Sequence, residues 1–132
     1  MRVFIDTSAF YALLDRDDEN HRKAKNAWID LLKNEDTLIT NNYVLVETFA
    51  LIQHRLGIDA VRGLQNDILP LVNIEFVVPE YHRSGVSALL SASRRNLSLV
   101  DCVSFEMMRT SEIKTVFAFD PHFKEQGFTI LP

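Results

Sequence analysis

The chain has 132 residues and a mass of 15.2 kDa, with 47% apolar and 24% charged residues. This length suits one domain, which we place over residues 1–132, and the apolar content excludes a disordered or low-complexity chain. Fourteen basic groups against 18 acidic groups give a formal charge of −4, which argues against binding nucleic acid through bulk positive charge. An enzyme that acts on nucleic acid is still compatible, because there the local charge pattern matters more than the sum.

Three features bear on the compartment in which the protein works. Cys102 is the only cysteine, so no internal disulfide can form and a reducing compartment is expected. The first apolar run reaches Asp6 too soon for a signal peptide. No apolar run approaches the roughly 20 residues that cross a bilayer. We therefore expect a cytoplasmic protein that makes no membrane contact.

The first half of the chain alternates short apolar runs with amphipathic segments. Residues 3–5 form an apolar run that ends at Asp-Thr-Ser, the pattern of a buried strand followed by a helix start. Gly57 marks a helix end, because glycine is favoured just beyond a helix C-terminus. In chain order, the pattern predicts a strand at 3–5, helices at 9–14 and 21–33, a strand at 37–40, and helices at 42–56 and 58–71, the last interrupted near Pro70.

The second half of the chain continues this alternation. It predicts a strand at 74–78, helices at 80–95 and 98–110, and strands at 114–119 and 128–131. Apolar strands that alternate with helices indicate an α/β fold, with a mostly parallel sheet covered by helices on both faces. In such sheets the active crevice lies at the carboxyl ends of the strands. Candidate functional residues are therefore expected at that edge.

Three aspartates lie directly after a strand or in the first turn of a helix. Asp6 follows the first strand and Asp120 follows the strand at 114–119, so parallel strands would bring both to one edge of the sheet. Each has the alternative of serving only as a helix N-cap. Asp101 comes three residues after Ser98, which predicts a capping box and places Asp101 in a first helical turn. A carboxylate in that turn can also face a cation.

Glu47 is the fourth acidic candidate. It aligns with Val44 and Leu51 on one face of the helix at 42–56. We therefore expect it in an apolar row, where a carboxylate is costly to bury unless it is paired or bound to a metal. The alternatives are that it reaches water beside this row or pairs with an arginine.

The four carboxylates together indicate a divalent cation. Converging carboxylates raise one another's pKa unless a cation neutralises them, and a hard divalent ion such as Mg²⁺ prefers such oxygen ligands. No paired cysteine and histidine accompany the acids, so zinc is not expected. The implied chemistry is metal-assisted phosphodiester hydrolysis by one or two ions, which activate a water and stabilise charge on the scissile phosphate.

At these motifs the sequence resembles the PIN-domain nucleases over essentially its whole length. The matching motifs are, in order, Phe-Ile-Asp-Thr-Ser ending at Ser8, Glu47 in the helix after Thr40, Leu-Ser-Leu-Val-Asp ending at Asp101, and Val-Phe-Ala-Phe-Asp-Pro-His-Phe around Asp120. The segment 18–28 is similar to the second helix of the family. The size of the chain is similar to that of the VapC-like toxins of toxin–antitoxin pairs.

This resemblance implies a three-layer α/β/α sandwich with a sheet of about five strands. It implies a Mg²⁺- or Mn²⁺-dependent endoribonuclease that cleaves RNA as the toxin of a VapBC-type pair, with a cognate antitoxin and a second copy of the chain, as a homodimer, for partners. The acidic site, both catalytic and metal-binding, would consist of Asp6, Glu47, Asp101 and Asp120. A hydroxyl of Thr7 or Ser8 would support Asp6 or a bound water.

The last motif departs from the family pattern at two positions. Many relatives have Thr or Ser two residues before the last Asp, where this chain has Ala118, so one hydroxyl is missing. Many also have a further acid shortly after that Asp, where this chain has His122, which predicts a weak or water-mediated fourth ligand.

Three basic residues are candidates for substrate contact. His122 follows Asp120 closely enough to contact the site, and Arg94 and Arg95 precede the Asp101 motif, where they could contact phosphate. For the two arginines, the alternative is a favourable position at a helix C-terminus.

Other functions are disfavoured at the same motifs. A phosphatase of the haloacid-dehalogenase type needs Asp-x-Asp after the first strand, where Ser8 replaces the second Asp, and a response-regulator receiver needs an acidic pair there. A catalytically weak PIN-like binding module is the alternative, favoured by Ala118 and opposed by the four acids. Without those four acids, 14 acidic groups balance 14 basic groups, so the charge of −4 equals that of the expected site.

Overall fold

The computed structural model describes the whole chain, residues 1–132, as five strands and seven α-helices. The strands are β1 (Arg2–Ile5), β2 (Thr37–Asn41), β3 (Asn73–Glu75), β4 (Thr115–Phe117) and β5 (Thr129–Leu131). The helices are α1 (Thr7–Leu14), α2 (His21–Lys33), α3 (Asn42–Leu56), α4 (Ile58–Gly63), α5 (Pro79–Ala92), α6 (Leu99–Thr110) and α7 (His122–Glu125). A π-helical turn (Leu64–Ile68) and a 3-10 turn (Leu69–Leu71) lead from α4 to β3.

All five strands form one parallel sheet in the order β3-β2-β1-β4-β5. The central strand β1 pairs with β2 on one side and with β4 on the other. Ile5 pairs with Phe117 at the ends of their strands, so Asp6 and the residues after β4 leave the sheet at the same edge. The predicted α/β fold with a parallel sheet is confirmed.

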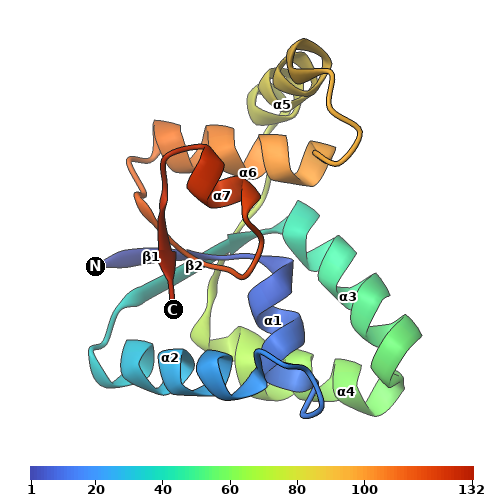
Figure 1. Cartoon of the computed structure of the whole chain (residues 1–132), viewed down its shortest axis with the longest axis vertical. Coiled ribbons are helices and arrows are strands. Elements are labelled where there is room, and N and C mark those ends of the chain that lie inside the picture. Colours follow the sequence, from blue (N-terminus) through green and yellow to red (C-terminus); the bar gives the residue numbers. More distant parts are fainter.

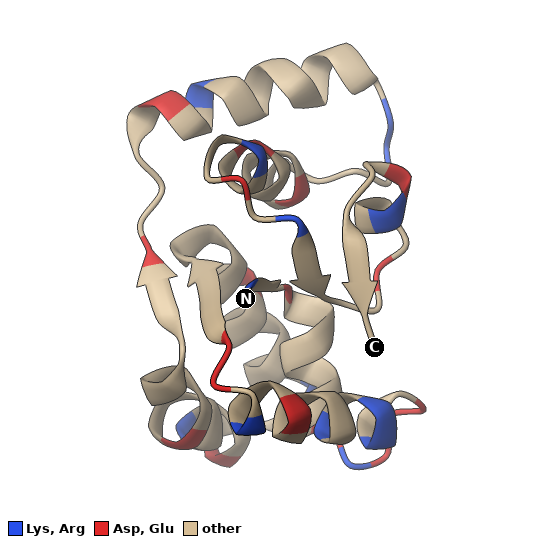
Figure 2. Cartoon of the chain, turned by 90° about the vertical axis from the view of Figure 1, so that its left-hand side faces the viewer, with Lys and Arg blue, Asp and Glu red and all other residues tan.

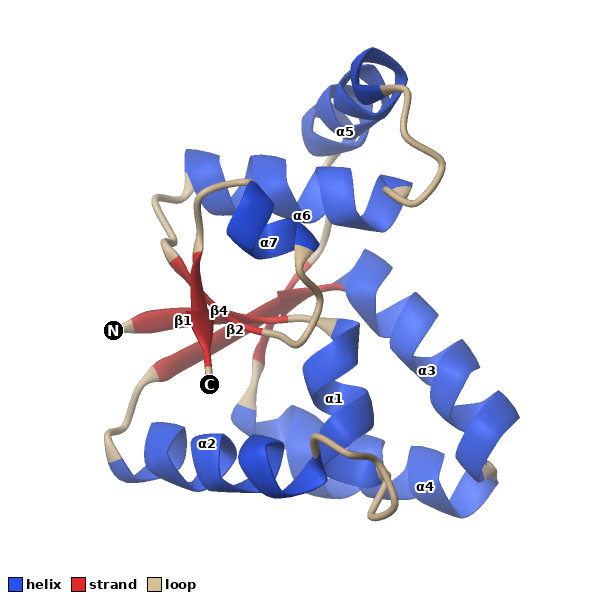
Figure 3. Cartoon of the chain, viewed as in Figure 1, coloured by secondary structure: helices blue, strands red, loops and turns tan.

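Helices cover both faces of this sheet, as Figures 1 and 3 show. Helices α1 to α4 gather on one side, and α6 and α7 cover the other, with α5 outside α6. The core between these layers includes Phe4 and Phe117 from the strands and Phe10, Ile52 and Met108 from the helices, all essentially inaccessible to solvent. Central strands are apolar throughout because both of their faces are buried. The expected three-layer sandwich is confirmed.

Helix α5 packs closely against α6, and Gly85 makes this possible. A Cβ atom at this position would lie 2.4 Å from Cγ2 of Val103, so only glycine lets the two helices approach to their observed separation. Helix α5 thereby supports α6, whose first turn contains Asp101, on the side that faces away from the sheet.

The observed elements differ from the expected ones mainly at their ends. The strand expected at 74–78 ends at Glu75, because the Val77 N–H donates to the side chain of Asn42 at 2.7 Å. The helix expected at 80–95 ends at Ala92, where Ser93 adopts a left-handed conformation with φ of 52°. Helix α7 was not expected, since four residues are too few for a periodic apolar pattern.

Acidic and basic residues lie interspersed along the helices in Figure 2. None of the helices is both long enough and apolar enough to cross a bilayer. With charges of both signs mixed on this side, contact with a polyanion would depend on a few local groups.

Candidate active site

Asp6 follows β1 and is the N-cap of α1. Its backbone N–H donates to the Phe117 carbonyl at 3.1 Å, which extends the β1–β4 pairing by one step. Its Oδ2 accepts from the Ser8 N–H at 3.1 Å and from the Ser8 hydroxyl at 2.7 Å, as a capping aspartate does. Asp6 is only 4% exposed. The sheet and the helix start therefore fix the direction of this carboxylate.

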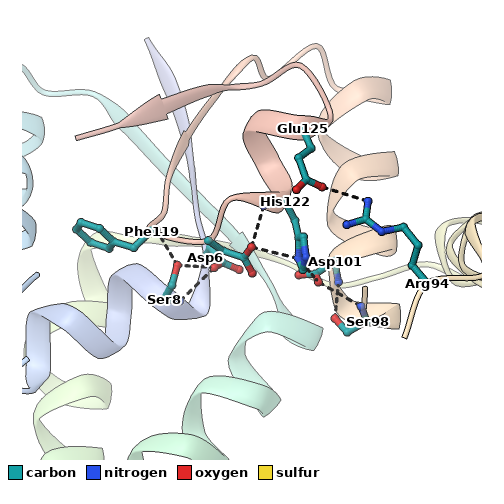
Figure 4. Close-up of polar contacts among 9 residues, drawn as sticks. Asp6, Ser8, Arg94, Ser98, Asp101, Phe119, His122 and Glu125 are labelled. Carbon is teal, nitrogen blue, oxygen red and sulfur yellow. Dashed lines mark hydrogen bonds and ion pairs between the residues drawn. The ribbon is translucent and has the colours of Figure 1, made fainter. Parts of the chain in front are cut away.

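The Ser8 hydroxyl joins the ends of β1 and β4. It donates to Asp6 and accepts from the Phe119 N–H at 2.9 Å, since a hydroxyl can do both. Figure 4 shows both contacts. Thr7, the other hydroxyl expected to support Asp6, instead faces α3, where its Oγ1 lies 2.9 Å from Oγ1 of Thr48.

Asp101 lies in the first turn of α6, and the predicted capping box is confirmed. The Asp101 N–H donates to the Ser98 hydroxyl at 3.1 Å, and Asp101 Oδ2 accepts from the Ser98 N–H at 3.2 Å. The residue is 8% exposed. These reciprocal bonds hold the carboxylate toward the turn that follows β4.

Asp120 lies in the turn after β4, and His122 is the first residue of α7, directly after Pro121. Asp120 Oδ1 accepts from the His122 N–H at 2.9 Å, a bond typical of aspartate in turns. His122 Nδ1 lies 3.1 Å from Asp120 Oδ1 and 3.5 Å from Asp101 Oδ2. Nδ1 is nevertheless buried without any hydrogen-bond partner. The structure thus places this imidazole against two of the four expected acids, and Figure 4 shows it beside Asp101.

Glu47 does not lie in a buried row as expected. It is exposed on α3, because no element covers this side of the helix completely, so the argument from the cost of burial was wrong. The side chain borders a shallow hollow of about 310 Å³ lined by Tyr43, Val46, Glu47 and Val100. Partial desolvation raises the pKa of Glu47, and the charges of Asp101 and Asp120 add to this rise, while the Thr7 hydroxyl opposes it.

The carboxylates at this edge influence one another's protonation. Burial raises the pKa of Asp6 to about 7, against the lowering effect of its bonds from Ser8, and the charges of Asp101 and Asp120 raise it further. Burial also raises the pKa of Asp101, where the Ser98 N–H opposes the shift and Asp120 adds to it. Burial is therefore the main cause of the raised pKa values, and the charges of Asp101 and Asp120 add to it at their acidic neighbours.

A divalent cation fits these donors. Asp101, Asp120 and His122 each offer one ligand atom, and the three atoms lie within 4.8 Å of one another. Two carboxylates and one imidazole suit a hard or intermediate divalent ion, and the unpartnered His122 Nδ1 is the kind of buried atom that such an ion would satisfy. Asp6 and Glu47 are outside this compact group, although their pKa values respond to its charges.

Arg94 and Arg95 lie in the loop between α5 and α6 rather than on a helix, since α5 ends at Ala92. Arg94 forms an ion pair with Glu125 of α7 at 3.1 Å, with the two side chains 40% and 45% exposed. This pair connects the loop before Asp101 to the helix after Asp120 (Figure 4). Arg95 is exposed and makes no ion pair.

Asn41, at the end of β2, is a buried polar residue that the sequence argument did not single out. Its Oδ1 accepts from the Val44 N–H at 2.8 Å, which caps α3. Its Nδ2 donates to the Ser104 hydroxyl at 3.2 Å and approaches Met107 Sδ at 3.5 Å, both on α6. The cap has a local signal, an asparagine directly before a helix, whereas the contact with α6 has none.

A family profile described as the PIN domain matches residues 3–128. The chain belongs to the PIN-domain family. Among curated relatives, the 23S rRNA-specific endonuclease VapC20 of Mycobacterium tuberculosis is 32% identical to this PIN domain over 127 residues. That match covers 96% of the chain and 95% of VapC20.

Solved structures of other proteins are similar to this PIN domain along its whole length. The crystal structure of M. tuberculosis VapC20, a sarcin-ricin loop cleaving toxin, has a TM-score of 0.87 and 31% identity, covering 98% of this chain and 99% of that chain. FitAcB from Neisseria gonorrhoeae has a TM-score of 0.70 and 16% identity, covering 100% and 97%. VapBC2 from Rickettsia felis, bound to a DNA fragment from its promoter, has a TM-score of 0.67 and 15% identity, covering 98% and 97%. The last two are similar in fold alone.

Proposed function

We propose that residues 1–132 form a single PIN domain that hydrolyses RNA phosphodiester bonds with Mg²⁺ or Mn²⁺, as the toxin of a toxin–antitoxin pair. The observation that supports this most strongly is the convergence of Asp101, Asp120 and His122 at the carboxyl edge of the sheet. The pKa values of Asp6 and Glu47 respond to the same charges. The 32% identity to VapC20, an endonuclease specific for 23S rRNA, supports RNA as the substrate class.

In this mechanism the chain's own side chains position the reactants. Asp101 and Asp120 would hold the ion, and Asp6, which Ser8 holds in place, would be a further ligand. When bound, the ion supplies positive charge to the scissile phosphate and lowers the pKa of a water. Glu47 is exposed beside the site and its pKa is raised, so it is suited to accept a proton from the attacking water.

The charge of the site makes RNA binding depend on the ion. Four carboxylates at one edge repel phosphate when no cation is present. The loop arginines Arg94 and Arg95, which precede the Asp101 motif, are candidates to contact the RNA backbone, and Arg95 has no competing ion pair. We therefore expect weak RNA binding without a divalent ion and tighter binding with one.

The deciding experiment measures cleavage of purified ribosomal RNA by the full chain. Wild type, Asp6→Asn and the exposed control Asp17→Asn are each assayed with Mg²⁺, with Mn²⁺ and with EDTA. Cleavage should require the added ion, disappear in Asp6→Asn and persist in Asp17→Asn. Cleavage that is unchanged by EDTA or by Asp6→Asn would overturn the metal mechanism. RNA binding without cleavage under every condition would favour the catalytically weak binding module instead.

We also propose two protein partners, a cognate antitoxin and a second copy of the chain. Val46 is 71% exposed beside Glu47 and lines the same hollow, so an apolar surface directly borders the acidic site. A partner that covers this hollow would also cover Glu47. Light scattering should give twice the chain mass of 15.2 kDa for the toxin alone, and the protein encoded by an adjacent small reading frame should suppress cleavage when added. A mass of 15.2 kDa would contradict the dimer, and unchanged cleavage would contradict the antitoxin.

A further inference from the structure

The ring nitrogen Nδ1 of His122 differs from those of the other histidines that lie against the fold. His21 Nδ1 lies 2.8 Å from the Ala12 carbonyl, and His82 Nδ1 lies 2.7 Å from the Tyr43 hydroxyl. His122 Nδ1 is fully buried and has no hydrogen-bond partner, although the ring as a whole is 12% exposed. A buried polar atom without a partner is costly, so we expect Nδ1 to bind a group other than a protein hydrogen-bonding atom.

The surroundings of Nδ1 indicate what that partner is. Both neighbouring acceptors, Asp120 Oδ1 at 3.1 Å and Asp101 Oδ2 at 3.5 Å, accept hydrogen bonds from backbone N–H groups but none from Nδ1. Two donors that occupy adjacent positions around an octahedral ion, each about 2.1 Å from it, lie about 3.0 Å apart. The Asp120 separation matches that spacing and the Asp101 separation exceeds it by about half an ångström. One ligand atom of each of the three residues lies within 4.8 Å of the others, so a single ion between them would give Nδ1 the partner that it lacks.

We infer that His122 is a nitrogen ligand of the ion at this site and makes the protein favour Mn²⁺ over Mg²⁺. This inference rests on the metal site of the proposed function and adds to it both a ligand and a metal preference. Imidazole nitrogen binds first-row transition ions well, whereas Mg²⁺ prefers carboxylate oxygen and water. Asp101 and Asp120 alone would serve either ion, so His122 is the residue that discriminates between them.

The test observes the ligand directly. The full chain is loaded with Mn²⁺, and electron spin echo envelope modulation is recorded. Wild type should show a ¹⁴N coupling to Mn²⁺ that is replaced by a ¹⁵N coupling when the histidines are ¹⁵N-labelled. The coupling should disappear in His122→Asn and persist in His54→Asn, a matched control at an exposed position of α3.

Metal titrations of the same proteins test the preference. In His122→Asn the Kd for Mn²⁺ should rise about tenfold or more, while the Kd for Mg²⁺ should change less than about threefold. A smaller effect on Mn²⁺, or an equal loss for both ions, would mean that His122 only positions Asp120 and would overturn the inference. Bound Mn²⁺ without nitrogen coupling, or coupling that survives in His122→Asn, would overturn it as well.

RNA cleavage by the same samples separates this inference from the proposed function. Nitrogen coupling without RNA cleavage would refute the nuclease and keep the ligand. Cleavage with Mn²⁺ but without nitrogen coupling would refute the ligand and keep the nuclease. A chain that binds no Mn²⁺ would overturn both the ligand and the metal requirement.

Discussion

The Ser8 hydroxyl donates a hydrogen bond to Asp6 over 2.7 Å. The same oxygen accepts the Phe119 N–H at 2.9 Å, so the residue immediately before Asp120 is held by the helix start that follows Asp6. Ala118, two residues before Asp120, is buried and carries no hydroxyl. In this chain Ser8 provides a hydroxyl at the junction from the β1 side.

Ser8→Ala is expected to lower both stability and metal affinity. The variant leaves the Phe119 N–H without its side-chain partner and removes a donor from Asp6, which together should lower the free energy of unfolding by about 1–3 kcal/mol. The pKa of Asp6 should rise further, because the bond from Ser8 lowers it in the wild type. Urea titrations with and without Mn²⁺ measure both effects. Ser87→Ala, at an exposed position of α5, is the control, and equal behaviour of the two variants would contradict the prediction.

The metal-free protein is expected to lose stability as the pH rises from about 4 to about 7. In this range the folded chain keeps a proton on Asp6 that the unfolded chain has released, because the pKa is about 7 when folded and near 3.8 otherwise. A difference of about 3 in the pKa of Asp6 corresponds to a loss of at most about 4 kcal/mol in the free energy of unfolding. Thermal unfolding in EDTA across this pH range tests the direction.

Asp6→Asn should be more stable than wild type at pH 8 without metal, and inactive at every pH. Asparagine is an equally good N-cap and has no charge to bury, so the stability cost of the carboxylate disappears together with its function. The comparison uses melting temperatures in EDTA, with Asp17→Asn as the control. A lower melting temperature for Asp6→Asn than for wild type at pH 8 would show that the burial cost of Asp6 is overstated.

Gly85→Ala is expected to destabilise the protein although alanine favours helices. The new Cβ would lie 2.4 Å from Val103, and such overpacking costs about 1–3 kcal/mol, more than the roughly 0.5–1 kcal/mol gained in helix propensity. Gly63→Ala is the matched control, since the nearest atom to a Cβ there is 3.9 Å away and only the gain should appear. Chemical denaturation of both variants decides the point, and similar changes would argue against the tight α5–α6 contact.

Arg95→Glu should weaken RNA binding more than Arg94→Glu. Arg95 is free of ion pairs, whereas Arg94 is already paired with Glu125, an exposed pair that contributes little to stability. Loss of one phosphate contact should reduce the slope of log K for RNA binding against log[salt] by about one. The melting temperature should stay unchanged. Binding is measured by fluorescence anisotropy with Mg²⁺ in a Glu47→Gln background, which should block cleavage and keep the ligands of the ion, with Lys25→Glu on α2 as the control for net charge. Equal weakening by all three substitutions would mean that only net charge matters.

The parts of the fold with local signals could be predicted from the sequence. The runs before Asp6 and Asp120 are apolar because central parallel strands are buried on both faces, so strand type and sheet edge followed directly. The capping box of Ser98 and Asp101 is likewise a local pattern.

The parts that depend on distant contacts could not be predicted. Helical periodicity placed Glu47 on the correct helix but predicted a buried side chain where the structure has an exposed one. Exposure depends on how far the neighbouring elements extend. The Ser8–Phe119 bond joins residues 111 positions apart, and neither residue type predicts it. The position of His122 against Asp101 depends on a four-residue helix that no periodic pattern predicts.

The buried side chain of Asn41 has a consequence for the distance between two of the carboxylates. Val44, which it caps, precedes Glu47 by three residues, and Ser104, to which it donates, follows Asp101 by three, so the amide lies about one helical turn from each acid. Apolar contacts between helices allow sliding along their axes, whereas a directional amide contact does not. One buried amide therefore links the first turn of α3 to α6 by directional bonds, so replacing Asn41 should change the position of Glu47 relative to Asp101.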